Sequence, residues 1–104
     1  MTEQFTQATV LTQANVYFDG ACVSYTVITA EDERVTIGVI FPSTLTFGTA
    51  APERMAIVSG ACRVLLPGET EWRDIAAGQE FSIPGDSSFD IEVTDTVNYV
   101  CHYG

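Results

Sequence analysis

Apolar and polar residues alternate along most of the chain, and turn residues interrupt the alternation at short intervals. Residues 22–29 and 34–41 each alternate in this way, and Pro42 ends the second run. Such a period of two predicts half-buried β-strands, whereas no stretch shows the 3.6-residue period of an amphipathic helix. Gly38 lies in the middle of the second run, which predicts a bend or a close backbone approach. We therefore expect an all-β sandwich or barrel of about nine or ten strands.

The stretch from Glu53 to Pro84 places several short apolar runs between glycine-marked turns. Met55–Ser59 and Ala61–Leu66 flank Gly60, which can adopt the positive φ of a tight turn, so we expect a β-hairpin there. Two further short strands follow, at 72–75 and 81–83.

The two ends of the chain differ in character. Residues 1–14 are rich in Thr and Gln and form either a loose tail or, as we favour, an arm that pairs with a barrel edge, whereas residues 15–104 read as a single domain. Near the C-terminus, residues 89–93 and 97–103 alternate, and we expect a turn over Thr94–Thr96 to separate two strands.

The charge balance narrows the possible partners. The sequence contains fourteen acidic residues but only four arginines, and the formal net charge is −10. Such a surface repels nucleic acids and anionic membranes, although one arginine with a few backbone N–H groups still suffices for a small phosphate. The N-terminus has no signal-peptide pattern, and no apolar run approaches the ~20 residues of a membrane span, so we expect a cytoplasmic protein.

Three cysteines, Cys22, Cys62 and Cys101, lie far apart in the sequence. Their number is odd, and their spacing matches neither a redox pair nor a zinc site. Because each falls in or beside an apolar strand pattern, we expect all three in the core as free thiols.

Two spacings in the central stretch carry a resemblance to a known architecture. Six residues separate Glu53 from Gly60, and five separate Gly78 from Pro84, as in the two motifs of the cupin double-stranded jelly roll. Several segments from Asn15 onward are similar, more specifically, to the cupin-type pyrimidine/purine nucleoside phosphorylases, long a family of unknown function. These segments are NVYFDG (15–20), TIGVI (36–40), APERMAIVSGACRVLLPG (51–68), Trp72, GQEFSIPGDSSF (78–89) and YVCHY (99–103).

Many cupins hold a metal with an H-x-H pair before the motif glutamate and a further histidine after the second motif. The corresponding positions here, 46–49 and 89, hold no histidine, and the chain has only His102. A three-imidazole site therefore cannot be assembled from one copy, so we expect neither a metal nor another cofactor.

The resemblance implies reversible phosphorolysis of purine and pyrimidine nucleosides, such as uridine and guanosine, to free base and ribose 1-phosphate. Such a site must hold phosphate, grip ribose and stabilise the departing base. Arg34 is the candidate for phosphate, although it also reads as a solvated arginine beside the acidic residues 31–33. Glu53 is the candidate for the ribose hydroxyls, and His102 for protonating the base, although a place at a strand edge is the simpler interpretation of this histidine.

Candidate substrate contacts come from aromatic and hydroxyl side chains. Aromatic rings can stack on a base, although each is more often plain core. A serine can reach a sugar or phosphate oxygen. The candidates are Phe47, Phe81, Phe89 and Tyr99 for stacking and Ser82 or Ser87 for hydrogen bonding.

We expect a homodimer, because the high apolar fraction leaves surface to cover. The competing hypothesis is a non-catalytic cupin that binds a small metabolite, since it would share every feature of the fold.

Overall fold

The computed structural model describes residues 4–104, which fold into nine β-strands with one 3-10 turn and no α-helix. All strand pairs are antiparallel. Within the described part of the chain, no helix is long and apolar enough to cross a membrane. The elements are β1 (Thr9–Val10), β2 (Asn15–Tyr17), η1 (Phe18–Gly20), β3 (Cys22–Ile28), β4 (Arg34–Ile40), β5 (Ser43–Thr49), β6 (Glu53–Leu65), β7 (Arg73–Ala76), β8 (Glu80–Ile83) and β9 (Ser87–Tyr103).

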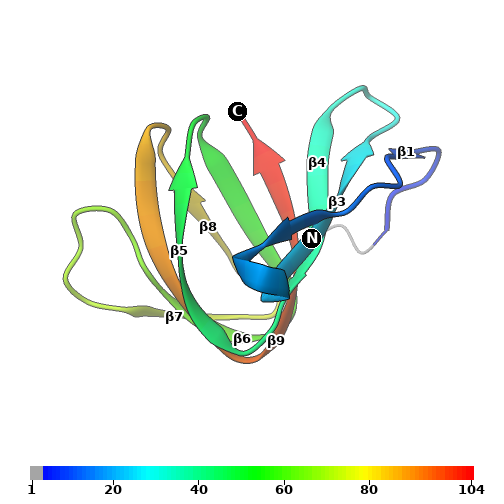
Figure 1. Cartoon of the computed structure of the whole chain (residues 1–104). Coiled ribbons are helices and arrows are strands. Elements are labelled where there is room, and N and C mark those ends of the chain that lie inside the picture. The colour runs from blue at the N-terminus through cyan, green and yellow to red at the C-terminus, as the bar shows by residue number, and fades with distance from the viewer. Residues whose placement is uncertain (1–3) are drawn as a thin grey trace.

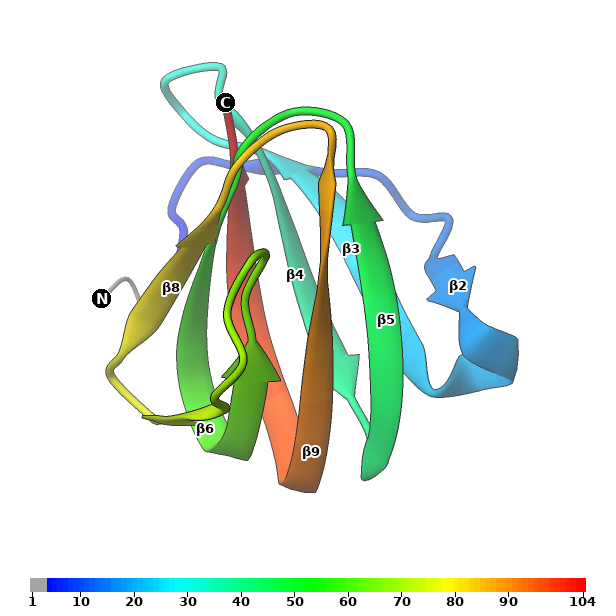
Figure 2. The same cartoon turned by 90° about the vertical axis from the view of Figure 1, so that its left-hand side faces the viewer.

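Two long strands, β6 and β9, join the two layers of the molecule. The first half of β9 pairs with β5 and its second half with β4. In the same way, β6 pairs with β8 through its first residues and with β7 through its last ones. Both strands curve together, so that the sheet bends into a U whose two arms face each other (Figure 1, Figure 2). This two-layered arrangement confirms the predicted all-β jelly roll.

The predicted hairpin at Gly60 is wrong, because β6 runs without reversal from Glu53 to Leu65. Gly60 does have a positive φ of 92°, but it lies where the register of β6 against β9 shifts. A Cβ at this position would overlap the carbonyl oxygen of Thr96 and approach the Cα of Val97 to 2.9 Å. The glycine therefore permits a bulge where the two long strands cross closely, rather than a turn.

The predicted turn at Thr94–Thr96 is also wrong, for the same reason. These residues lie inside β9, which continues from Ser87 to Tyr103 through the bend of the sheet. The break in the alternating pattern marks the curvature of one strand instead of the boundary between two.

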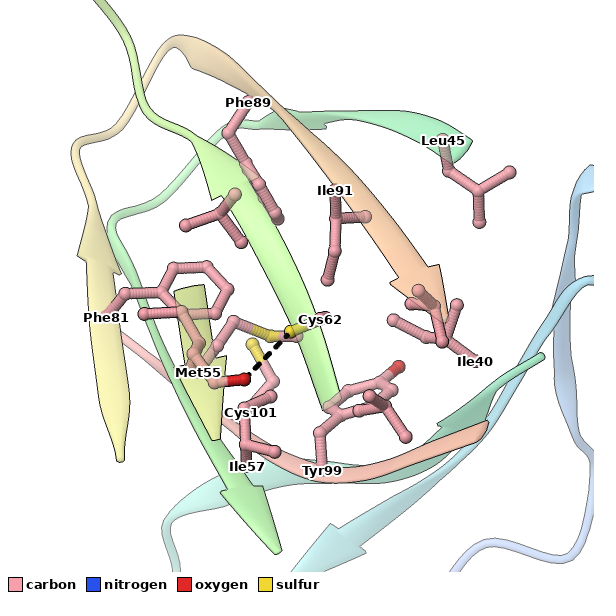
Figure 3. Packing of buried hydrophobic residues seen from close by; sticks show 14 of the residues in the cluster. Ile40, Leu45, Met55, Ile57, Cys62, Phe81, Phe89, Ile91, Tyr99 and Cys101 are labelled. Atoms are coloured by element: carbon pink, nitrogen blue, oxygen red, sulfur yellow. Dashed lines mark hydrogen bonds between the residues drawn. The ribbon is translucent and has the colours of Figure 1, made fainter. Parts of the chain in front are cut away.

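The core lies between the two arms of the U, where inward-facing side chains of both layers interdigitate (Figure 3). Ile40, Ile57 and Ile91 are fully buried there. The three cysteines are free and buried, as predicted, and the Cys62 thiol lies 3.9 Å from the Ile75 carbonyl oxygen.

The N-terminal segment adds an edge strand to the sheet and covers part of its outer face. β1 pairs with β3, with Val10 opposite Val27. Phe5 and Ala8 pack against a small outer cluster of Val27, Val35 and Val100. Residues 1–3 of the predicted arm lie outside the described residues.

Candidate active site

A cavity of about 130 Å³ lies near the first residues of β6 and the last residues of β9. Antiparallel pairing places Glu53 opposite Tyr103 and Met55 opposite Cys101, and all four side chains line the cavity. The remaining lining residues are Tyr17 on β2, Ser24 on β3, Phe47 and Gly48 on β5, and two further residues of β9, Phe89 and Tyr99.

An aromatic wall closes one side of the cavity. The rings of Phe47 and Phe89 stack with centroids 5.7 Å apart and an interplanar angle of 20°. Phe18 meets Phe47 edge-on at 5.2 Å, and Phe81 meets Phe89 at 5.6 Å. Of the aromatic candidates, Phe47, Phe89 and Tyr99 thus line the cavity, whereas Phe81 is buried behind Phe89 and supports its ring.

Glu53 supplies the one carboxylate of the cavity lining. Its Oε1 lies 3.5 Å from the Cys101 thiol, which donates to it. Burial raises the pKa of Glu53, and this effect is partly offset by the Cys101 hydrogen bond and by the positive charge of Arg34. Burial and the nearby Glu53 raise the pKa of Cys101 to about 12, so the thiol stays protonated and remains a donor at neutral pH.

Arg34 begins β4 and lies close to this carboxylate, although it does not itself line the cavity. Its guanidinium carbon is 4.3 Å from the centroid of the Tyr103 ring. The hydroxyls of Tyr103 and Thr36 are hydrogen-bonded at 3.0 Å. The structure thus brings Arg34 and Glu53 together on either side of Tyr103.

Arg34 differs from the other arginines in its partners. The remaining three form ion pairs with carboxylates, whereas Arg34 has no salt bridge to any residue that the structure describes. The three pairs are Arg54–Glu80 at 2.9 Å, Arg63–Glu92 at 2.8 Å and Arg73–Glu69.

Hydroxyl groups from β3 and β9 form the polar part of the wall. Ser24 is almost fully buried and accepts a hydrogen bond from the Asn15 amide at 3.3 Å. The Tyr99 hydroxyl lies 3.5 Å from the Cys22 thiol, and burial raises the pKa of Tyr99 well above its ordinary value. These groups therefore stay uncharged and can either donate or accept hydrogen bonds.

The serine and histidine candidates, Ser82, Ser87 and His102, also lie outside the lining of the cavity. Ser82 is exposed and lines a second hollow of about 340 Å³, together with His102 and Arg54. His102 alternates with the inward-facing Cys101 and Tyr103, so it points to the other side of β9. Burial and the charge of Arg54 lower the pKa of His102.

Sequence reasoning missed Tyr103 and Cys101, which line the cavity beside Glu53. The period of two in the last strand could have found both, because they share a face with Tyr99. By contrast, no local pattern indicates Tyr17 or Ser24, whose strands reach the cavity only through tertiary pairing.

Few metal ligands gather anywhere in the described part of the chain. Residues 4–104 contain no cluster of three His, Cys, Asp or Glu side chains that could hold a metal ion.

Comparison with known proteins gives consistent matches over nearly the full length. Residues 12–103 match the family described as pyrimidine/purine nucleoside phosphorylase. The pyrimidine/purine nucleoside phosphorylase of Cupriavidus metallidurans is 58% identical over 101 residues, which cover 97% of this chain and 98% of the relative. A crystal structure of an Acinetobacter sp. ADP1 protein of unknown function superposes with a TM-score of 0.94 at 47% identity, covering 97% and 98% of the two chains.

A more distant structure shares the fold alone. A putative ethanolamine utilization protein from Salmonella typhimurium superposes with a TM-score of 0.67 at 16% identity, covering 93% of this chain and 94% of that protein. Its similarity supports the two-layered jelly-roll fold.

Proposed function

Since the chain belongs to the pyrimidine/purine nucleoside phosphorylase family, we propose that it converts purine and pyrimidine nucleosides plus phosphate to free base and ribose 1-phosphate. The reaction runs in both directions. A phosphate oxygen forms a bond to the anomeric carbon of ribose while the glycosidic bond breaks. The base leaves with the electron pair of that bond and takes up a proton, and positive charge develops on the sugar in the transition state.

The environment of Arg34 is the observation that carries this proposal. Phosphorolysis needs a cation for phosphate, and the other three arginines are already paired with carboxylates. Arg34 lies over Tyr103 beside the cavity, close enough for its charge to lower the pKa of Glu53. In a chain with a net charge of −10, an arginine beside the cavity that has no salt bridge to a described residue provides a local site for an anion that the rest of the surface repels.

Glu53 has the position required of a ribose ligand. Its carboxylate faces the cavity, where it can accept hydrogen bonds from ribose hydroxyls and stabilise the positive charge that develops on the sugar. The Cys101 thiol donates a hydrogen bond to Oε1 of Glu53, and this bond orients the carboxylate before the substrate arrives.

We assign the base to the aromatic wall. Phe47 and Phe89 line the cavity as a stacked pair in which Phe47 is the less buried ring, and every purine and pyrimidine has a π-face that can stack on such a ring. A wall of this kind contributes affinity without selecting one pattern of donors and acceptors, which fits a broad range that includes both uridine and guanosine.

We propose that the reaction requires no metal and no organic cofactor. The groups near the cavity are an arginine, a carboxylate, a thiol and hydroxyls, which suit oxyanion and sugar binding better than coordination of a transition metal. Activity in the presence of a chelator tests this part of the proposal.

We also propose a homodimer that acts in the cytoplasm. Tyr25 and Ile37 are cross-strand neighbours on the outer sheet face, and both remain about two-fifths exposed, with Val10 nearby on β1. An apolar face of this kind is suited to a second copy. If the dimer forms through this outer sheet face, Ile37→Glu yields a monomer in light scattering.

The buried free thiols of the three cysteines fit a reducing compartment, which supports the proposed location in the cytoplasm.

The deciding experiment measures release of base and ribose 1-phosphate from uridine and guanosine, with and without phosphate and with a chelator present. We expect the release of base to depend on phosphate and to persist in the presence of the chelator. Arg34→Ala should lower kcat/KM about a hundredfold. Arg73→Ala is the matched control, because Arg73 is paired with Glu69 away from the cavity. Binding of nucleosides without turnover in any condition would instead support a non-catalytic, metabolite-binding cupin.

A further inference from the structure

Tyr103 is held in place from two sides. Its hydroxyl is hydrogen-bonded to Thr36 at 3.0 Å, and Thr36 is itself 5% exposed on β4. The guanidinium of Arg34 lies over the Tyr103 ring. Tyr103 also lines both the cavity and the second hollow, with Glu53 as its cross-strand partner. Because β9 lies between β4 and β6, Tyr103 is flanked by Arg34 on one strand and Glu53 on the other.

The mode of contact leaves the hydrogen-bonding groups of Arg34 available. The guanidinium carbon of Arg34 lies 4.3 Å from the centroid of the Tyr103 ring, and its N–H groups form no salt bridge to any residue that the structure describes. In the other three arginines these same donors are engaged by carboxylates, as in the bond from Arg54 to Glu80 at 2.9 Å. The cation–π contact thus holds Arg34 while its N–H groups remain available to an oxyanion.

Because of the acidic turn before β4, the Arg34 side chain needs a contact that restrains its position. Residues 31–33 are Glu, Asp and Glu, and all three are exposed directly beside Arg34. An arginine side chain has many rotamers, and an unrestrained one would be drawn toward these carboxylates. The Tyr103 ring offers the guanidinium a competing position on the cavity side of the turn.

We propose that Tyr103 is the positioning residue of the phosphate subsite: its ring, fixed by Thr36, holds Arg34 with its donors free for phosphate. This inference rests on the proposed function, because it assigns Arg34 to phosphate. Because Tyr103 also lines the cavity, it predicts that changes at Tyr103 weaken phosphate binding more than nucleoside binding.

The test is steady-state kinetics of Tyr103→Phe, Tyr103→Leu and Thr36→Val, with each substrate varied in turn. We expect Tyr103→Leu to raise the KM for phosphate about tenfold and the KM for uridine by a clearly smaller factor. Tyr103→Phe keeps the ring but loses its hydrogen bond and should raise the phosphate KM about threefold, and Thr36→Val should do the same. Equal rises in both KM values, or an unchanged phosphate KM in Tyr103→Leu, would overturn the inference.

A binding measurement separates this inference from the proposed function. Inorganic phosphate should raise the Tm of the wild-type protein, and Tyr103→Leu and Arg34→Ala should lose that shift. If the wild type stabilises with phosphate in a Tyr103-dependent way but converts no nucleoside, the positioning role stands and the proposed function fails. If Tyr103→Leu does not fold, Thr36→Val still decides, because it frees the ring without removing it; an unchanged phosphate response in that variant overturns the role.

Discussion

The ring of Tyr99 fills the space that a side chain on Gly38 would need. The two residues are cross-strand partners in β4 and β9, and a Cβ on Gly38 would lie 2.6 Å from the ring of Tyr99. The missing side chain lets the ring lie across β4 and bring its hydroxyl to Cys22. The sequence predicted a bend or a close backbone approach at Gly38, and the structure shows that an aromatic side chain makes the close approach.

We therefore predict that Gly38→Ala destabilises the protein by about 1–3 kcal/mol, because the added methyl group displaces a buried ring. Denaturant unfolding measures the change. Gly48→Ala is the matched control: Gly48 also lies within a strand, but the nearest atom to its Cβ position is 3.9 Å away. The control should stay within about 0.5 kcal/mol of the wild type. Equal stability of the two variants would contradict the account.

The same kind of glycine shows why the sequence predicted the strands better than their continuity. A positive φ at Gly60 was a sound expectation, but both a tight turn and a bulge use it. The difference depends on whether the chain reverses or continues along β9, and that pairing involves residues about forty positions away. Local alternation therefore identified most strands, whereas the bends in β6 and β9 came from tertiary pairing.

The candidate site was predictable to a similar extent. Arg34 and Glu53 were chosen for their chemistry, and the structure places them near each other. Tyr103 connects them only because β9 pairs with β4 on one side and β6 on the other. Ser82 was chosen because a serine hydroxyl can reach a sugar or phosphate oxygen, but alternation between two inward-facing neighbours turns it to the outside.

Glu53→Gln should lower activity and raise stability at neutral pH. Burial raises the pKa of Glu53, so the ionised carboxylate costs stability once the pH exceeds its unfolded pKa, and glutamine removes that cost. We expect a higher Tm than the wild type at pH 7 and convergence below about pH 4, where both side chains are neutral. The kcat/KM should fall about a hundredfold.

Thermal melts across pH check the stability part of this prediction. Glu71→Gln serves as control, because Glu71 is exposed and away from the cavity, and its Tm should match the wild type throughout. A Glu53→Gln variant less stable than the wild type at pH 7 would show that the carboxylate contributes more through its contacts than its burial costs.

The native thiols should resist alkylation and disulfide exchange at pH 8. Burial raises the pKa of Cys62 to about 11 and, together with Glu53, that of Cys101 to about 12, so little of either thiol is the reactive thiolate. Cys22 is also buried, with its pKa raised. Titration with a chromogenic disulfide should detect almost no thiol in the native protein and all three in denaturant. Rapid modification of the native protein would contradict the burial of these residues.

His102→Gln should leave phosphorolysis nearly unchanged, within about twofold in kcat/KM. The imidazole lies on the side of β9 away from the cavity, so it cannot reach a base stacked on Phe47.

The same substitution should change how stability depends on pH. Burial and the charge of Arg54 lower the pKa of His102, so the folded protein resists protonation of the imidazole. As the pH falls through about 6.5, the unfolded chain takes up this proton more readily, and the wild type loses stability that the glutamine variant keeps. The measurement pairs pH–rate profiles with melts at pH 5 and 8: a Tm advantage of the variant at pH 5 alone, with matching rate profiles, supports a structural histidine. A loss of kcat with a missing inflection near neutral pH would instead return His102 to the role of proton donor.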